Sequence, residues 1–256
     1  MHRLQGRVAV VTAAGSGMGR ASSIRFAEEG AHVVVTDKDE AAAKQVAGEI
    51  SAAGGAASAM VCDVGDLDQI RAVVDAVERD HGVLHVLFNH AGIPGAAGLD
   101  VTPDDWADTV DVNQRGAFYA TQYALPLLRR ADRKGSIIFT ASVSGVVGSP
   151  FSPLYSMTKG GIVLLMMSLA IKLGPEGIRC NAILPAMIDT PMLPQFFGRE
   201  HGADIADLRD AYKANVPMAR MGDASEIASV AAFLASDDAS WVTGVPLPVD
   251  GGFLAR

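Results

Sequence analysis

The side chains best placed to do chemistry in this sequence are a tyrosine and a lysine four residues apart, Tyr155 and Lys159. They precede an apolar run at 160–173 that predicts a helix, where such residues share one face about 6 Å apart along the axis. A phenol ordinarily titrates near pH ~10, and a neighbouring ammonium lowers its pKa because it favours the phenolate. The pair therefore predicts proton transfer, with Ser142, after the strand-like run 135–141, holding a carbonyl oxygen against the phenol. The alternative is a solvated pair with no chemical role, because this spacing also arises by chance.

Composition restricts the classes of protein to consider. The chain has 256 residues, 49% hydrophobic and 20% charged, which is enough for a sizeable core in one large α/β domain or two small ones. The formal net charge is −8 and the basic cluster 129–134 is short, so we expect no nucleic-acid partner. That cluster is expected to be a solvated helix end.

Cysteine usage and hydropathy indicate a reducing, aqueous setting. Cys62 and Cys180 each lie in an apolar strand-like run, so we expect buried thiols and a cytoplasmic protein. There is no Cys-x-x-Cys motif, and no metal is predicted. The apolar run 8–14 passes directly into a glycine-rich turn and the run 162–171 is short, so we expect neither a signal peptide nor a membrane span.

The N-terminal region has the pattern of a nucleotide-binding βαβ unit. An apolar strand at 8–12 is followed by a turn with Gly15, Gly17 and Gly19, a helix at 20–29 and a second strand at 31–37. Glycines let the backbone approach a pyrophosphate, and the helix N-terminus supplies free N–H groups. The alternative is that the glycines only turn the chain.

The acid that ends the second strand, Asp37, selects between the two nicotinamide cofactors. Its carboxylate can hold both hydroxyls of the adenosine ribose and would repel a 2′-phosphate, so NAD is favoured over NADP. Lys38 stands next to it and leaves NADP possible.

The same alternation continues to the end of the chain. Further strands are expected at 59–64, 84–89, 135–141, 179–184 and 245–249, and helices at 40–53, 67–79, from Thr102 or Asp104 to 124, at 155–173, and from Asp223 or Ser225 to 235. The pattern predicts an α/β fold over residues 1–256, a single-domain Rossmann-type doubly wound parallel sheet of about seven strands with helices on both faces. Ligands bind such sheets at the carboxyl ends of the strands.

Several polar residues fall at those ends. Asp63 can receive an adenine amino group or cap the helix at 67–79. The tight turn after Asn89 can pass under a ribose. Asn113, in a helix interior, either has a role there or is a buried amide bonded to neighbouring backbone.

The segment 187–217 is too long for an ordinary connection. It mixes methionine, phenylalanine, proline and charges, and we expect a substrate lid or a pair of small helices that complete the core. Phe151, Met187 and Met192 are candidate walls of an apolar or mixed substrate pocket.

Over essentially its whole length the sequence resembles a classical short-chain dehydrogenase/reductase. The resemblance rests on the glycine pattern 12–19 with Ala13 at the first glycine, the motif Asn89-His90-Ala91-Gly92, the catalytic positions Asn113, Ser142, Tyr155 and Lys159, the pair Pro185-Ala186, Thr190, and Asp250-Gly251-Gly252. The motifs are individually weak and jointly specific.

The resemblance implies roles for these residues. Tyr155 exchanges a proton with the substrate oxygen, Lys159 lowers the tyrosine pKa and binds the nicotinamide ribose, and Ser142 orients the substrate. Asn113 supports a water chain that carries protons to solvent. The implied cofactor-binding residues are Ser16, Gly17, Met18, Asp37, Asp63, Val64, Asn89, Ala91, Gly92, Tyr155, Lys159, Pro185, Ile188 and Thr190. A homotetramer is also implied, built partly from the helix after Tyr155 and the C-terminal strand.

Three positions depart from the family pattern. Ala13 and Ala186 replace glycines, so we expect these turns to avoid positive φ, which alanine tolerates poorly. His90 replaces an amide near the nicotinamide, where it packs, contacts the substrate or shifts the pH optimum.

The sequence thus predicts an NAD-dependent oxidoreductase that transfers a hydride between the cofactor and a secondary alcohol or ketone. One alternative is an NADPH-dependent 3-oxoacyl-[acyl-carrier-protein] reductase, with Arg129, Arg130 and Lys172 meeting an acidic carrier. The other is a nucleotide-binding sensor or scaffold without catalysis. The identity of the substrate is not encoded in any motif.

Overall fold

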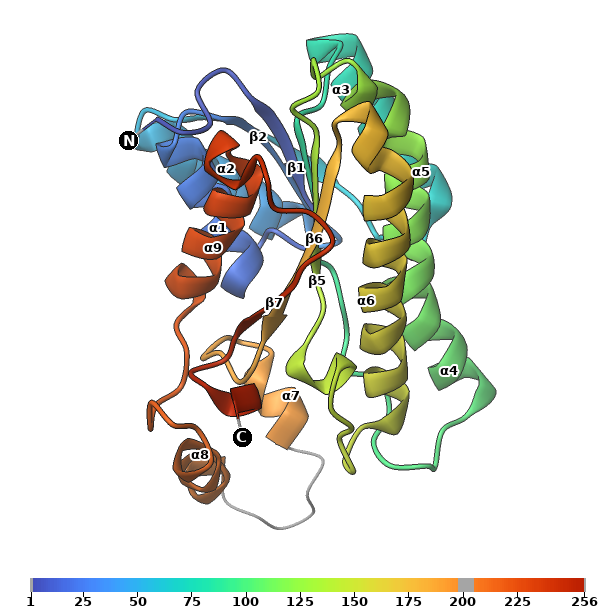
Figure 1. Cartoon of the computed structure of the whole chain (residues 1–256), viewed down its shortest axis with the longest axis vertical. Coiled ribbons are helices and arrows are strands. Elements are labelled where there is room, and N and C mark those ends of the chain that lie inside the picture. The colour runs from blue at the N-terminus through green and yellow to red at the C-terminus, as the bar shows by residue number, and fades with distance from the viewer. Residues whose placement is uncertain (1, 198–204, 256) are drawn as a thin grey trace.

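A seven-stranded parallel sheet forms the centre of the computed structural model, which describes residues 2–197 and 205–255. Within this part of the chain the strand order is β3-β2-β1-β4-β5-β6-β7, and every neighbouring pair is parallel (Figure 1). The strands are β1 (Val8–Val11), β2 (His32–Asp37), β3 (Ala56–Val61), β4 (Val86–Asn89), β5 (Ser136–Thr140), β6 (Arg179–Pro185) and β7 (Pro246–Val249). The predicted fold class is confirmed.

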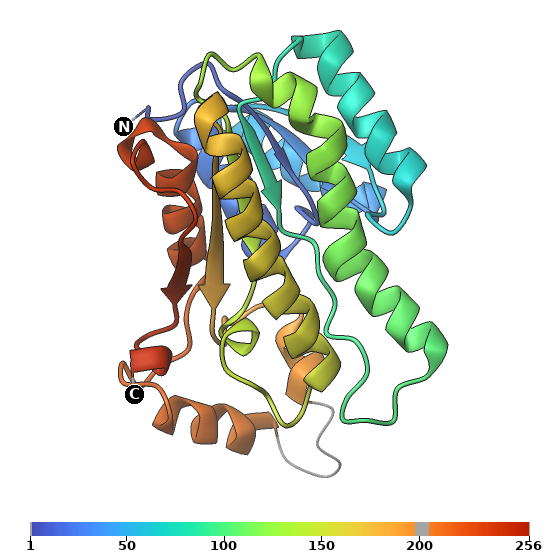
Figure 2. The ribbon, with the colours of Figure 1, turned by 45° about the vertical axis from the view of Figure 1, so that its right-hand side comes forward.

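Helices cover both faces of the sheet, as a parallel sheet requires because its strands are apolar on both sides (Figures 1 and 2). One apolar cluster lies between the sheet and α1, α2 and α9, and the other between the sheet and α3, α5 and α6. These helices are α1 (Gly17–Glu28), α2 (Glu40–Ala52), α3 (Leu67–His81), α5 (Gly116–Arg129), α6 (Pro153–Leu173) and α9 (Ala224–Ala235). The central strands β1, β4 and β5 are buried along their whole length.

Two predicted boundaries were displaced by three residues. The third strand was expected at 59–64 and lies at Ala56–Val61, paired along the full length of β2. Its first residues are alanine and serine, whose weak strand preference hid them from the pattern. The first helix begins at Gly17 rather than at residue 20, inside the glycine-rich turn.

The prediction that Asp63 caps the helix at 67–79 is wrong. Asp66, not Asp63, caps α3 by accepting the N–H groups of Asp68 and Gln69. The carboxylate of Asp63 instead accepts the N–H of Gly65 at 2.8 Å.

The predicted helix from Thr102 to residue 124 is longer and less regular than expected. Thr102 caps α4 (Pro103–Val110), and α5 continues through Pro126 to Arg129. Between them lies one π-helical turn, Asp111–Arg115, which contains Asn113. Such turns widen a helix by one residue and often occur at functional sites.

Ala13 contradicts the expectation about positive φ. Its φ is 51°, so alanine occupies the left-handed region that glycine would ordinarily fill. The N–H of the next residue, Ala14, donates to the carbonyl of Thr36 in β2 at 2.8 Å, and this hydrogen bond fixes the turn to the neighbouring strand. Ala186 is outside the positive-φ residues, as expected.

The connection after β6 folds into two short helices, α7 (Leu193–Phe197) and α8 (Ile205–Ala214). Residues 198–204 of the expected lid lie outside the described residues. The segment before α7 is anchored: Ile188 and Gly222 form a parallel bridge, and the N–H of Met187 donates to the Tyr212 hydroxyl at 2.9 Å.

Helix α6 is apolar on more than one side. With the turn that follows it, the segment 153–176 is long and apolar enough to cross a membrane by length and composition alone, which the short run 162–171 did not suggest. The core helix of a globular domain passes the same test, and α6 contributes Ile162, Val163 and Met166 to the core.

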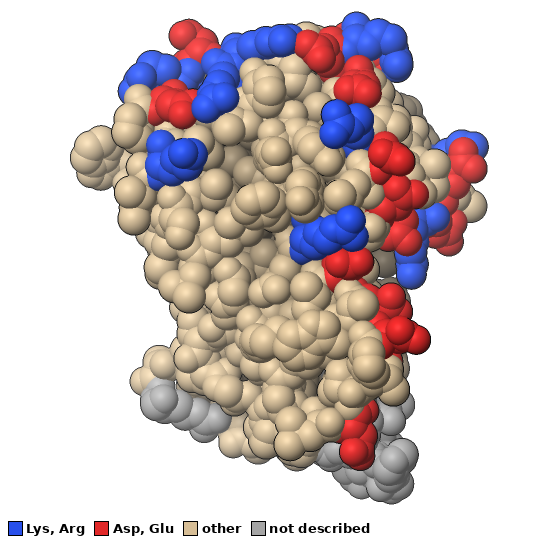
Figure 3. Space-filling model, turned by 90° about the vertical axis from the view of Figure 1, so that its right-hand side faces the viewer, with Lys and Arg blue, Asp and Glu red and all other residues tan. Residues whose placement is uncertain are grey.

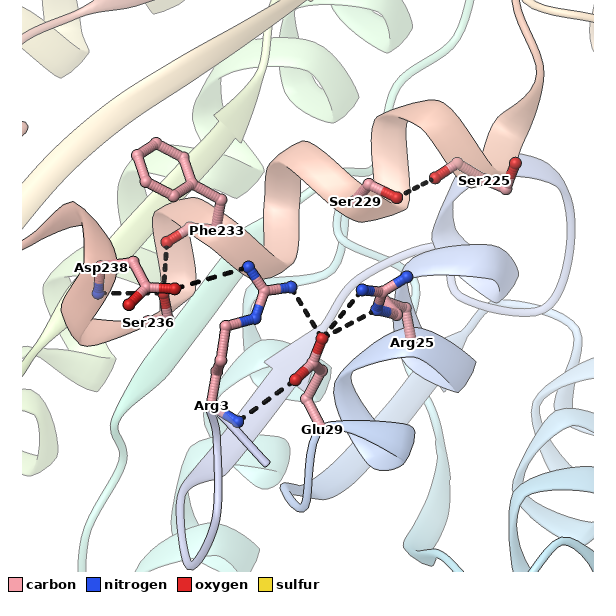
Figure 4. Close-up of polar contacts among 8 residues, drawn as sticks. All are labelled: Arg3, Arg25, Glu29, Ser225, Ser229, Phe233, Ser236 and Asp238. Carbon is pink, nitrogen blue, oxygen red and sulfur yellow. Dashed lines mark hydrogen bonds and ion pairs between the residues drawn. The ribbon is translucent and has the colours of Figure 1, made fainter. Parts of the chain in front are cut away.

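Glu29 is a buried carboxylate at the edge of the sheet opposite the cleft described below. It is 3% exposed and accepts hydrogen bonds from the guanidinium groups of Arg3 at 2.7 Å and Arg25 at 2.9 Å (Figure 4). Arg3 also reaches Asp238, which follows α9, so the N-terminal segment is joined to the C-terminal one. The Arg3 hydrogen bond, joined by those of Arg25, lowers the pKa of Glu29 to about 2.

We predict that Glu29→Gln lowers stability at pH 7 by about 2 kcal/mol, since two cations lose their buried partner. Because the folded-state pKa is depressed, the wild-type advantage is present above the unfolded value of 4.5 and is lost as pH falls toward about 2. Urea unfolding of both proteins from pH 7 to pH 3 measures this. Glu40→Gln, in an exposed pair with Lys44, is the matched control and should change stability little. A Glu29→Gln deficit that does not depend on pH would contradict the assignment.

Candidate active site

Among the described residues, a large cleft opens at the carboxyl ends of the strands. Its volume is about 670 Å³, within the range of small-molecule and cofactor sites. The lining residues come from strand ends and the turns after them, from α1, α4, the π-turn and α6, and from the segment after β6: Ala13, Ser16, Gly17, Met18, Asp37, Lys38, Cys62, Asp63, Val64, Gly65, Asp66, His90, Ala91, Gly92, Ile93, Asp108, Asp111, Val112, Thr140, Tyr155, Lys159, Thr190, Pro191, Met192 and Gln195. Most of the predicted cofactor residues are therefore brought together.

The glycine-rich turn forms one end of this cleft. A side chain on Gly19 would overlap the carbonyl of Ala13 and the ring of His90, and Gly17 has a φ of +52°. The N-cap residue Ser16 does not cap α1 with its side chain, so N–H groups of the first turn face the cleft without that ligand. Close backbone packing and an uncapped helix N-terminus suit a pyrophosphate.

Asp37 is fixed where β2 ends. Its carboxylate accepts the N–H of Gly15 at 2.9 Å and the N–H of Asp39 at 3.0 Å. These bonds hold the carboxylate at the end of the cleft next to the glycine turn, where its remaining lone pairs can accept further hydrogen bonds. Lys38 lines the cleft beside it, as the sequence suggested.

Lys159 is buried at the other end, with 3% of its surface exposed. Its Nζ donates to the carbonyl of Thr140 at 2.8 Å and lies 5.6 Å from the centre of the Tyr155 ring. Burial lowers the pKa of Lys159 to about 8. The ammonium group therefore lies between the carbonyl at the end of β5 and the phenol ring of Tyr155.

Tyr155 lines the cleft from the first turn of α6. The ring of Phe196, from α7, stands edge-on to it with centroids 5.3 Å apart. An aromatic residue of α7 therefore packs against the phenol ring that is expected to transfer protons.

Asn113 is fully engaged in holding the site together. Its Oδ1 accepts the N–H of Ile93 at 2.8 Å, and its Nδ2 donates to the Ile93 carbonyl and to the Thr158 hydroxyl. A side chain on Gly92 would come within 3.0 Å of the Lys159 Nζ and 3.3 Å of the Asn113 Oδ1. Gly92 therefore leaves room for these two side chains where α6, the π-turn and the turn after β4 converge.

Ser142 lies two residues after the end of β5, is buried, and is not among the residues that line the cleft. Its Oγ accepts the N–H of Ser144 at 3.1 Å and caps the short 3₁₀ turn Val143–Gly145. Since the oxygen is already an acceptor, the hydroxyl proton remains to be donated.

Some predicted residues do not line the cleft. Asn89 is buried and donates to the Thr121 hydroxyl at 3.1 Å, while Pro185 and Ile188 are buried in and after β6. Of the three candidate substrate walls, Met192 lines the cleft. Met187 lines a separate cavity of about 280 Å³, and Phe151 is largely exposed.

His90 is neutral across the physiological range. Burial and the nearby Lys159 lower its pKa to about 3, so its own titration does not move a pH optimum near neutrality. Its Nδ1 lies 2.8 Å from the Thr140 hydroxyl.

The sequence reasoning missed Thr140, Ile93, Gln195 and the specific contact of Phe196. Thr140 carried a usable signal, because it is the last polar residue of a strand that runs into the predicted site. The Phe196 contact had none, since it depends on how α7 folds back.

Comparison with known proteins agrees with this geometry. Residues 12–254 match the family model described as "Enoyl-(Acyl carrier protein) reductase". The L-rhamnose 1-dehydrogenase (NAD(P)(+)) of Azotobacter vinelandii is 39% identical over 98% of this chain and 97% of its own length. The chain belongs to the short-chain dehydrogenase/reductase family.

Two further relatives also match this chain over nearly the whole length of both proteins. The 3-oxoacyl-[acyl-carrier-protein] reductase FabG of Thermotoga maritima is 35% identical over 98% of this chain and 99% of its own length. The crystal structure of levodione reductase superposes with a TM-score of 0.94 at 34% identity, covering 99% of this chain and 100% of that one. Membership in the short-chain dehydrogenase/reductase family makes this protein an oxidoreductase with a nicotinamide cofactor, NAD or NADP.

Proposed function

We propose that this protein is an NAD-dependent oxidoreductase that interconverts a secondary alcohol and its ketone, with Tyr155 as the general acid and base. The observation that carries the proposal is the buried Lys159 ammonium beside Tyr155, in the same cleft as the glycine turn and Asp37. When bound, the nicotinamide supplies or accepts the hydride that this chemistry needs.

The chain's own residues divide the remaining work. Tyr155 holds the proton that moves to or from the substrate oxygen, and the positive charge of Lys159 favours its phenolate form. Ser142 donates its free proton to the same substrate oxygen and so orients the substrate. Asn113 fixes the Ile93 backbone and Thr158, which keeps α6 at the correct distance from the turn after β4.

The charges around the cleft support NAD over NADP. The described lining residues include the carboxylates of Asp37, Asp63, Asp66, Asp108 and Asp111 against two lysines. A 2′-phosphate would add negative charge at the acidic end, next to Asp37.

Ion pairs on the protein surface weigh against the acyl-carrier-protein alternative, although a relative carries that name. Arg129 is paired with Glu176 and Arg130 with Glu78, so these cations are already partly neutralised on the surface that an acidic carrier would meet.

We therefore propose a small alcohol or ketone as the substrate. Its pocket is covered by the lid segment 187–217, and this segment forms part of a single domain over residues 1–256. Two free, buried cysteines support a cytoplasmic setting.

Tyr155→Phe is predicted to lower turnover by at least about a hundredfold, because the proton donor is removed while the ring remains. NADH affinity should fall by no more than about twofold, since the phenol hydroxyl is only one of the predicted cofactor contacts. Two test substrates come from the names of relatives: L-rhamnose, and 2,3-butanediol from a meso-2,3-butanediol dehydrogenase of Serratia marcescens that is 36% identical to this chain. Their oxidation, followed as NADH formation, gives the rate, and fluorescence titration gives the affinity. Tyr119→Phe, on α5, is the matched control. Unchanged turnover in Tyr155→Phe would overturn the tyrosine mechanism.

Asp37→Ala is predicted to reverse the cofactor preference. The wild type should bind NADH at least about tenfold more tightly than NADPH, and the variant should lose NADH affinity while gaining NADPH affinity, because the repulsion is relieved. Titration of both cofactors at one ionic strength tests this. Asp39→Ala, which removes a neighbouring carboxylate that caps α2, is the control. A wild type that prefers NADPH would favour the carrier-protein reductase.

We also propose that the protein assembles as a homotetramer and that α6 forms one of its interfaces. Leu164 is 66% and Ile171 81% exposed, and they are seven residues apart on one side of α6. The face that carries α5 and α6 is broadly uncharged, with Lys, Arg, Asp and Glu gathered toward the top and the right-hand edge (Figure 3). A helix that is apolar all round is ordinarily covered on all sides.

Leu164→Glu with Ile171→Glu is predicted to shift the protein to a smaller assembly, because two charges would be buried in the interface. Sedimentation velocity at micromolar protein concentration measures the shift. Ala52→Glu, on α2 at the opposite face of the sheet, is the control. A monomeric wild type, or a double variant of unchanged size, would contradict the proposed interface.

A further inference from the structure

His90 is held by three separate parts of the fold. Its N–H and that of Ala91 donate to the Thr12 hydroxyl at 2.9 and 3.0 Å, which fixes the backbone to the end of β1. Its ring lies 5.3 Å from the ring of Phe88. On another side, a side chain on Gly19 would come within 2.8 Å of its Cδ2, so the imidazole packs directly on the glycine turn.

The polar contact of this ring leads to the lysine of the site. The Nδ1 of His90 is 2.8 Å from the Thr140 hydroxyl, and the carbonyl of the same threonine accepts the Lys159 ammonium at 2.8 Å. Thr140 is the last residue of β5, where the pairing with β6 ends. Its side chain and its carbonyl are therefore the connection between the imidazole and the ammonium.

We propose that His90 is a positioning residue for Lys159: by holding Thr140 at the end of β5, it fixes the carbonyl that orients the lysine ammonium toward the cofactor cleft. The inference rests on the proposed function, in which Lys159 binds the nicotinamide ribose. It gives the histidine a role in the cleft that requires neither contact with the substrate nor titration.

The charge state of the ring suits this role. A neutral imidazole beside Lys159 adds no repulsion, and it can bond to a hydroxyl through Nδ1 as either donor or acceptor. The low pKa of His90 keeps the ring in that form at neutral pH. Because the ring also packs on Gly19, the position of Lys159 is tied to the turn that holds the pyrophosphate.

The competing explanation is that the His90 side chain only fills space. The size and polarity of the residue that replaces His90 distinguish this explanation from the positioning role. In asparagine a polar atom lies close to the position of Nδ1, whereas in glutamine it lies closer to that of Nε2. If the Thr140 contact matters, His90→Asn should retain function and His90→Gln should not. If only volume matters, the larger glutamine should be tolerated better.

The primary measurement is the dissociation constant of NADH by fluorescence titration. His90→Ala and His90→Gln are expected to raise it about fivefold, because without the hydrogen bond to Thr140 the Lys159 ammonium is held less well in the cleft. His90→Asn should remain within about twofold of wild type. Thr140→Val, which keeps the shape and removes the hydroxyl, should match His90→Ala, and Thr140→Ser should match wild type.

A double-mutant cycle tests whether the effect passes through Lys159. Lys159→Met alone should raise the dissociation constant, and adding His90→Ala should raise it no further. Additive losses, or His90→Asn as weak as His90→Ala, would overturn the inference. Wild-type affinity in both His90→Ala and Thr140→Val would do the same. If any His90 variant fails to fold, the Thr140 pair decides alone.

Failure of the proposed function would look different. A wild type that does not bind NADH, or Lys159→Met with wild-type affinity, removes the ribose contact itself and overturns both proposals. NADH binding that is weakened by Lys159→Met and indifferent to His90 and Thr140 overturns only the positioning role.

Discussion

An ammonium group withdrawn almost entirely from water is the constraint on which this site depends. Lys159 can be buried only because the carbonyl of Thr140 faces its Nζ, and that carbonyl is available because β5 ends there. The lowered pKa of the lysine reflects the incomplete compensation. The chain thus keeps in the cleft a cation whose pKa is lowered by burial, a condition typical of groups at functional sites.

The site also depends on positions where the backbone packs too closely against other groups to leave room for a side chain. Gly19 and Gly92 each lie where a methyl group would meet another part of the site, and the Ala13 turn accepts an unfavourable backbone conformation to keep the same geometry. The strain is local, and the extensive apolar clusters on both faces of the sheet stabilise the scaffold that maintains it. The carboxyl edge of the sheet can therefore be tightly packed around a cleft and still be a binding site.

Most of the fold was predictable because long apolar runs and glycine turns report burial and chain reversal directly. Strand and helix order, the cleft edge and the grouping of Asp37, Tyr155 and Lys159 followed from such local patterns. Side-chain direction did not follow: Asn89 turns toward Thr121 rather than into the cleft, although it stands in a recognisable motif. The start of β3 and the π-turn around Asn113 were hidden for a related reason, since pairing partners and packing, not the local residues, decide them. The contact between Phe196 and Tyr155 depends on a distant segment folding back, which no spacing encodes.

Helix α6 carries three duties in 21 residues. Its first turns hold the phenol and the lysine, one side fills the core beneath the sheet, and the opposite side leaves large apolar groups in solvent. Few positions along α6 take part in none of these three roles. Sequence drift in this helix should therefore be slow, and neutral change should accumulate elsewhere, on the solvated faces of α2 and α3. For the same reason an engineer seeking a place for a label, a tag or a random library should leave α6 alone.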